Sequence, residues 1–242
     1  MKNTISILLA VIMAAAVAAL SVSAAGLGDA TTNCGTWTYE SGTLKGGAEA
    51  NGDNLANTGI KIESGKHILV SVDVKADAFQ GACGFGLHFS ADPNGGVGNG
   101  QGVLTWTGDN GGFTQFKTWN WNANVLGTAP DYWDPIENLA WNDTTTVYTV
   151  AAEFFDDGTA QYSIKNNSTG AEHVLQGKAL EFLFPESGCV YVNLIILNQA
   201  VSFSNLVVKD LSAPDTSDAA IATVIVSVAL IATSVVISKK RK

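Results

Sequence analysis

The chain has 242 residues and a formal net charge of −9. All 22 acidic side chains lie within residues 26–218, alongside only eight lysines and no arginine, so this segment alone carries a charge of −14. Because phosphate binding needs clustered lysine and arginine, we exclude a nucleic-acid partner.

The N-terminus, residues 1–25, is typical of a secretory signal peptide. Lys2 precedes an apolar run, and small residues that suit a cleavage site follow this run. We therefore expect the rest of the chain to be exported. In an oxidising compartment, two states of Cys34, Cys83 and Cys189 are open: one disulfide with a leftover thiol, or three buried thiols.

The middle of the chain, residues 26–210, has almost no helical pattern. Short runs rich in Val, Ile, Thr and aromatic residues alternate apolar and polar side chains between clusters of Gly, Asn, Asp and Ser. The clearest run, 67–75, buries every second residue. Further strands are expected over residues 85–90, 103–107, 113–119, 146–154, 160–165, 182–184, 190–197 and 201–209. The Asp-Asp-Gly sequence at 156–158 predicts a hairpin, because Asp-Gly accepts the positive φ of such turns. This pattern predicts an all-β ectodomain folded as a two-sheet jelly-roll sandwich.

Residues 108–143 interrupt this pattern. They hold four of the six tryptophans and little alternation after Trp119. A long loop inside a compact domain is usually functional or disordered, and so many aromatics argue against disorder. Aromatic rings stack on the apolar faces of sugars, while amides and carboxylates bind the hydroxyls. The candidate ligand-binding residues are therefore Trp119, Asn120, Trp121, Asn122, Trp133 and Asp134. The alternative is that these tryptophans fill the sandwich or cover a sheet edge.

Calcium is the candidate cofactor. Asp92, Asn94 and Asn99 lie in a glycine-rich loop whose oxygens suit a hard cation. Tight turns explain the same residues, and we favour them over a calcium site.

Catalysis has little support in the sequence. A glycosidase needs two carboxylates at a defined separation, and the nearest grouping is Glu153 with Asp156 and Asp157. We expect no enzyme, with a glycoside hydrolase as the minor alternative.

The C-terminus predicts a membrane anchor. A polar linker, 211–218, precedes an uncharged apolar run, 219–238, and the basic residues 239–242. Twenty apolar residues span a bilayer as a helix, and the basic tail stays on the cytoplasmic side. We expect a single-pass membrane protein with its ectodomain outside the cell.

The linker adds a resemblance. Pro214, Thr216 and Ser217, followed by the apolar run and basic tail, are similar to a Gram-positive cell-wall sorting signal of pattern Leu-Pro-any-Thr-Gly. Ala213 and Ser217 depart from that pattern. The resemblance implies a bacterial surface protein attached to the cell wall, and plain membrane anchoring is the alternative.

Three further runs carry a fold resemblance: the opening aromatic run at 37–45, Gly-Leu-His-Phe at 86–89, and the closing run at 201–208. Their order resembles the concanavalin A-like and laminin G-like jelly rolls of secreted carbohydrate-binding and adhesion modules. The resemblance implies a surface module that binds a glycan or cell-wall polysaccharide. The competing reading is a structural envelope or surface-layer protein without a small ligand.

Overall fold

The computed structural model describes residues 26–32, 36–47, 53–78, 83–107, 114–120, 132–136, 144–197 and 200–212. The chain divides into two compact units, residues 23–210 and residues 1–22 with 211–242. Apart from residues 211–212, the second unit lies outside the described residues, so the signal peptide, the apolar run at 219–238 and the sorting-like residues stay predictions. Within the described ranges, no helix is long and apolar enough to cross a membrane.

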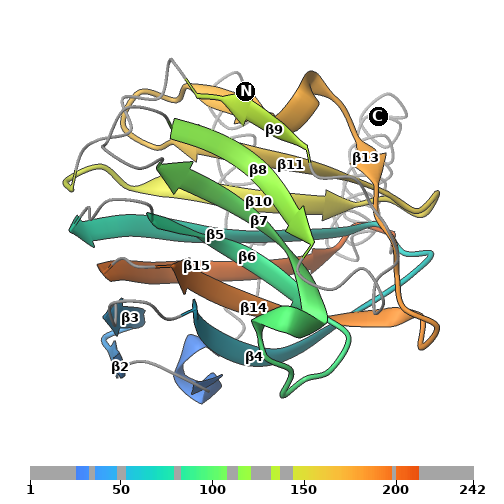
Figure 1. Cartoon of the computed structure of the whole chain (residues 1–242), viewed down its shortest axis with the longest axis horizontal. Coiled ribbons are helices and arrows are strands. Elements are labelled where there is room, and N and C mark those ends of the chain that lie inside the picture. Colours follow the sequence, from blue (N-terminus) through green and yellow to red (C-terminus); the bar gives the residue numbers. More distant parts are fainter. Residues whose placement is uncertain are drawn as a thin grey trace, which may run out of the picture. The chain divides into compact units, whose positions relative to one another are not determined.

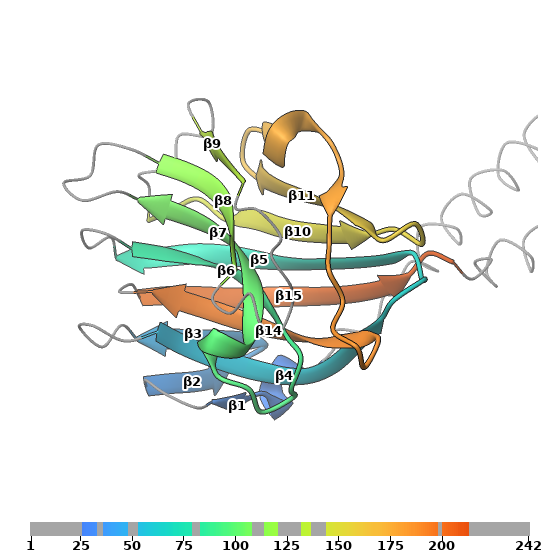
Figure 2. The same ribbon diagram turned by 45° about the vertical axis from the view of Figure 1, so that its right-hand side comes forward.

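The described strands form two antiparallel sheets packed face to face (Figures 1 and 2). The seven-stranded sheet has the order β1 (Thr31–Thr32), β4 (Asp53–Glu63), β14 (Cys189–Leu197), β6 (Cys83–Ser90), β7 (Gly100–Thr107), β8 (Thr114–Asn120) and β9 (Trp133–Pro135). The eight-stranded sheet has the order β12 (Glu172–Val174), β11 (Thr159–Asn166), β10 (Tyr148–Phe154), β5 (Ile68–Ala78), β15 (Ala200–Asp210), β3 (Thr43–Gly47) and β2 (Thr36–Glu40), with β13 (Leu180–Glu181) also paired to β11. Short 3-10 turns occur at η1 (Leu27–Asp29), η2 (Val97–Asn99) and η4 (Leu175–Gly177). The predicted all-β, two-sheet architecture is confirmed.

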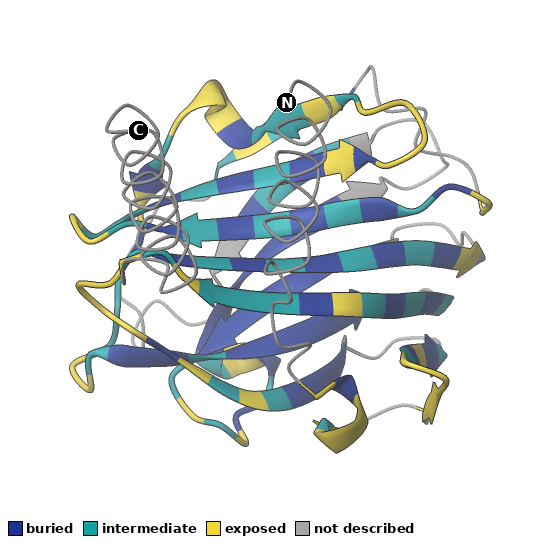
Figure 3. Cartoon of the chain, turned by 180° about the vertical axis from the view of Figure 1, so that it is seen from behind, coloured by how far each residue is buried: buried dark blue, intermediate teal, exposed yellow. Residues whose placement is uncertain are grey.

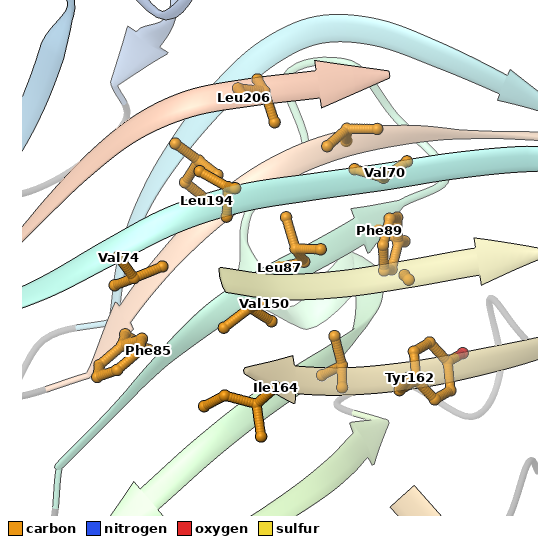
Figure 4. Packing of buried hydrophobic residues seen from close by; sticks show 14 of the residues in the cluster. Val70, Val74, Phe85, Leu87, Phe89, Val150, Tyr162, Ile164, Leu194 and Leu206 are labelled. Atoms are coloured by element: carbon orange, nitrogen blue, oxygen red, sulfur yellow. The ribbon is translucent and has the colours of Figure 1, made fainter. Parts of the chain in front are cut away.

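The main core lies between the sheets. In the eight-stranded sheet, alternate residues of β5 and β10 point inward, as Val72 and Val150 do opposite each other in register. Figure 3 shows the resulting bands of buried and half-buried residues along these strands. Leu87 and Leu194 of the seven-stranded sheet belong to the same buried cluster (Figure 4). The alternation seen in the sequence therefore reflects one buried and one wet face.

The hairpin between β10 and β11 is also confirmed. Gly158 has a φ of 86°, and the carboxylate of Asp157 accepts the backbone N–H of Thr159 at 2.9 Å. The prediction of a strand over 182–184 is wrong, because β13 ends before it. Phe182 nevertheless packs in the core, with its ring centroid 4.8 Å from that of Phe154.

The seven-stranded sheet buries a second apolar cluster on its other side. We call the side that points away from the eight-stranded sheet the outer face. The cluster there consists of Leu55, Val97, Leu104, Ile195 and Leu197. Val97 comes from the loop 91–99, which therefore folds onto the outer face.

The structure describes the thiol of one of the three cysteines. Cys189 is a buried free thiol. Cys34 and the side chain of Cys83 lie outside the described residues.

Candidate functional site

An exposed tryptophan marks the edge of the seven-stranded sheet. Trp133 opens β9 and is 54% exposed. Among the described residues, only Tyr39 is a comparably exposed large apolar side chain, at 51%. Tryptophan is enriched at binding interfaces because it offers a large apolar face, so Trp133 is the strongest candidate for a contact residue.

The strand register places Trp133 on the outer face. It stands opposite Lys117 of β8, which stands opposite the buried Leu104 of the outer-face cluster. Gln115, two residues before Lys117, lies on the same face because side chains alternate along a strand. Both Gln115 and Lys117 are half-buried. The ring is therefore flanked by an amide and an ammonium group.

Asp134 points the other way, toward the space between the sheets. It stands opposite Phe116, which belongs to the main core. Its carboxylate accepts a hydrogen bond from His173 Nε2 at 3.2 Å and further hydrogen bonds from the backbone and side-chain N–H groups of Gln176. The Asp134 contacts thus join the edge of the seven-stranded sheet to β12, the edge strand of the eight-stranded sheet, and to η4.

These contacts also hold the backbone of Trp133. Gln176 Nε2 donates to the carbonyl oxygen of Trp133 at 3.1 Å. Gln176 itself has a φ of 56°, in the left-handed region. The rings of His173 and Phe116 pack edge to face, with their centroids 6.3 Å apart. The short edge strand β9 is therefore held by side chains that lie about forty residues further along the chain. His173 and Gln176 carry no local sequence signal for this role, and the sequence analysis did not identify them.

The other predicted ligand-binding residues are placed only in part. Trp119 and Asn120 end β8, the strand beside β9, with Trp119 opposite Gly102 in register. Their side chains lie outside the description, as do Trp121 and Asn122 altogether. Trp133 and Asp134, predicted as a pair, lie on opposite sides of β9.

The predicted calcium loop is a hydrogen-bonded turn. Asp92 Oδ1 accepts the backbone N–H of Asn94 at 2.8 Å, and the Asp92 carbonyl accepts that of Gly95 at 3.0 Å. Asn99 closes the loop through its carbonyl, which accepts the N–H of Ala91. No group of three or more His, Cys, Asp or Glu that could hold a metal occurs among the described residues. Asp92 is used as a turn cap, and the geometry favours the turn over the calcium site.

Two of the three carboxylates considered for catalysis have other partners. Glu153 Oε1 lies 2.7 Å from His67 Nε2. Asp157 caps the β10–β11 turn, and its hydrogen bonds to Thr159 lower the pKa of its carboxyl.

A buried histidine lies under the loop 91–99. His88 of β6 is fully buried on the outer face, and its Nε2 donates to the carbonyl oxygen of Val97 at 3.0 Å. Its Nδ1 lies 3.3 Å from Nδ2 of Asn193 and accepts from it. Burial lowers the pKa of His88 to about 4, so the ring is neutral at pH 7. A neutral ring sealed from solvent anchors the loop and is out of reach of a substrate.

The sequence matches no model of a known protein family, and no curated protein sequence matches it. Solved structures with a similar fold include the Emp46p carbohydrate recognition domain in its metal-free form, at 11% identity and a TM-score of 0.53 over 76% of this chain and 89% of that one. The exoplasmic/lumenal domain of VIP36, bound to Ca²⁺ and Man3GlcNAc, has 10% identity and a TM-score of 0.53 over 76% and 85%. The CBM2 module of the evolved Dit protein of Lactobacillus casei BL23 phage J-1 has 8% identity and a TM-score of 0.54 over 75% and 81%. At these identities the similarity establishes the fold alone: the chain has the jelly-roll sandwich of lectin-like and carbohydrate-binding modules.

Proposed function

We propose that this chain is a carbohydrate-binding module that stacks a sugar on Trp133 at the β9 edge of the seven-stranded sheet. The observation that carries the proposal is the exposure of this ring on a strand whose backbone is tied at both Trp133 and Asp134. Sugars present apolar C–H faces that pack on aromatic rings. A ring whose backbone is already held in place loses less conformational freedom when it binds, which favours affinity.

The surroundings of the ring suit a polyhydroxylated ligand. Gln115 and Lys117 flank Trp133 on the same face and carry donors for sugar hydroxyls. In this proposal Asp134 and its partners His173 and Gln176 position the ring and do not touch the ligand. Trp119, Asn120, Trp121 and Asn122 stay candidate contacts that the sequence alone predicts.

The structural neighbours support the same class of ligand. VIP36 is bound to Man3GlcNAc, and the other two are named as a carbohydrate recognition domain and a carbohydrate-binding module. With the predicted signal peptide and C-terminal apolar run, the module would act in adhesion or glycan capture at the outer surface of the cell membrane, with a glycan or cell-wall polysaccharide as partner. It would be no enzyme.

Trp133→Ala tests the proposal, with Tyr39→Ala as the matched control. The two rings are almost equally exposed, but Tyr39 lies on the edge strand β2 of the other sheet. A glycan array with the full-length protein first identifies a ligand, and titration calorimetry then measures affinity. We expect Trp133→Ala to weaken binding by about 30-fold, the loss typical of a hot-spot ring, and to lower the melting temperature by about as much as Tyr39→Ala does.

Tyr39→Ala should bind as the unmodified protein does. Unchanged binding by Trp133→Ala would remove the ring from the site. If the unmodified protein binds no glycan on the array, the structural envelope or surface-layer role replaces the proposal.

A further inference from the structure

Two buried carbonyl oxygens on the outer face of the seven-stranded sheet lack a donor. Asn57 of β4 and Asn193 of β14 stand opposite each other in register and are only 4% and 0% exposed. The Oδ1 atom of each is buried and has no hydrogen-bond partner within the part of the chain that the structure describes. A buried acceptor that loses its hydration without compensation is strongly unfavourable. With the amides in the orientations that the structure gives them, no described side chain donates to either atom, and one small molecule from outside the polypeptide would satisfy both.

The orientation of the Asn193 amide is fixed by its neighbours. Its Nδ2 lies 3.2 Å from the carbonyl oxygen of Tyr191, which can only accept, and 2.8 Å from Ser90 Oγ. His88 Nδ1 is a third acceptor at the same end of the amide. Exchanging the oxygen and nitrogen of Asn193 would therefore place its oxygen against the Tyr191 carbonyl. The Oδ1 atom must face away from this network, toward β4.

The chemistry of the site selects a neutral donor. Opposite residues in an antiparallel pair have Cβ atoms about 5 Å apart, so one small molecule can reach both amides. The outer-face neighbours in the adjacent rows are the apolar Leu55 and Ile195. A cation placed here would be buried without a counter-charge, which is costly. The molecule must donate two hydrogen bonds and carry no charge.

We infer that Asn57 and Asn193 bind one water molecule between β4 and β14. A β-bulge in β4 begins directly after Asn57, where the register with β14 shifts. There Thr58 Oγ donates to the carbonyl oxygen of Val192 at 2.6 Å, and Gly59 has a φ of 72°. Bulges disrupt the strand pairing locally, which leaves room for a bridging molecule. The water extends the chain of hydrogen bonds that runs from the loop 91–99 through His88 and Asn193, and so joins this loop to β4.

Nuclear magnetic resonance on the ¹⁵N-labelled full-length protein tests the site. The experiment compares laboratory-frame and rotating-frame Overhauser effects between water and the side-chain amide protons of Asn193. We expect cross-peaks of opposite sign in the two frames, the signature of a water held far longer than surface hydration. Asn57→Leu, which removes one acceptor, should abolish these cross-peaks.

Ser90→Ala is the control, because exchange of the Ser90 hydroxyl with solvent would produce a similar cross-peak. The signal should persist in this variant. Loss of the signal in Ser90→Ala, its absence from the unmodified protein, or a direct hydrogen bond from Asn57 Nδ2 to Asn193 Oδ1 would each overturn the inference. The spectrum of the unmodified protein decides the question even if Asn57→Leu does not fold.

Discussion

The two sheets bury their residues in different ways. In β10 of the eight-stranded sheet, buried and half-buried residues alternate strictly from Tyr148 to Phe154. In β14 of the seven-stranded sheet, every residue except Tyr191 is buried. The first sheet therefore has one wet face, whereas the second is covered on both sides along most of its central strand β14. The loop 91–99 is a described part of that cover.

This difference narrows the search for a binding site. A ligand cannot reach the centre of the outer face, where His88, Ile195 and Leu104 are fully buried. Exposure returns toward the margins of the sheet, at β9 and at the end of β4, where Lys61 and Glu63 are exposed. Because the middle of the outer face is covered and Trp133 lies at its margin, a binding contact would form at the edge of the sheet.

A buried charge on the outer face should have the largest effect. Ile195→Asp places a carboxylate in the outer-face cluster, whereas Ala151→Asp places one on the wet face of the eight-stranded sheet. We expect Ile195→Asp to lower the free energy of unfolding by more than about 4 kcal/mol, because the charge has no partner there. Ala151→Asp should change it by only about 0.5 kcal/mol.

Urea denaturation followed by tryptophan fluorescence measures both variants. If Ile195→Asp is as stable as Ala151→Asp, the outer face is open to water and the comparison between the sheets fails. That result would also make the middle of the sheet available to a ligand.

Sequence patterns could predict the half-exposed sheet better than the covered one. The alternation in residues 67–75 and 146–154 corresponds to β5 and β10, because each has one face in water. The apolar run in β14 indicates a strand but cannot show that both faces are buried. The strand β4, with Asn54 and Asn57 among its buried residues, was not predicted at all.

The candidate site shows the same limit. Trp133 could be selected from the sequence because aromatic residues gather in residues 108–143. Its support could not, because Asp134 and Gln176 are 42 residues apart and meet only when the two sheets pack. The same holds for Asn57 and Asn193, which strand pairing alone brings together.

Acid should weaken the attachment of the loop 91–99 to the covered sheet. The pKa of His88 is about 4 in the folded chain, against about 6.5 for an ordinary histidine. Between these values the unfolded chain binds a proton that the folded chain does not. The neutral, buried His88 therefore contributes its full stabilisation of the folded chain above about pH 6.5. This contribution is lost as the pH falls toward 4 and changes no further below that. The free energy of unfolding falls by about 3 kcal/mol in total.

His88→Gln isolates this contribution. The glutamine amide can still donate to the carbonyl of Val97 but does not titrate. Denaturation at a series of pH values should show a steeper loss for the unmodified protein than for the variant between pH 6.5 and 4. Parallel curves would mean that His88 is accessible to protons in the folded state, and hence that the cover is loose.

The smallest expected effect concerns the turn within this cover. Asp92→Ala removes the carboxylate oxygen that accepts the Asn94 N–H at 2.8 Å. We expect a loss of about 1 kcal/mol, because this hydrogen bond to a carboxylate is exposed to solvent. If Asp92 serves only the turn, thermal melting in excess calcium and in chelator should give the same difference between variant and unmodified protein. A calcium-dependent rise in the melting temperature of the unmodified protein that Asp92→Ala abolishes would instead establish a metal site, because an ion that binds only the folded loop stabilises it by mass action.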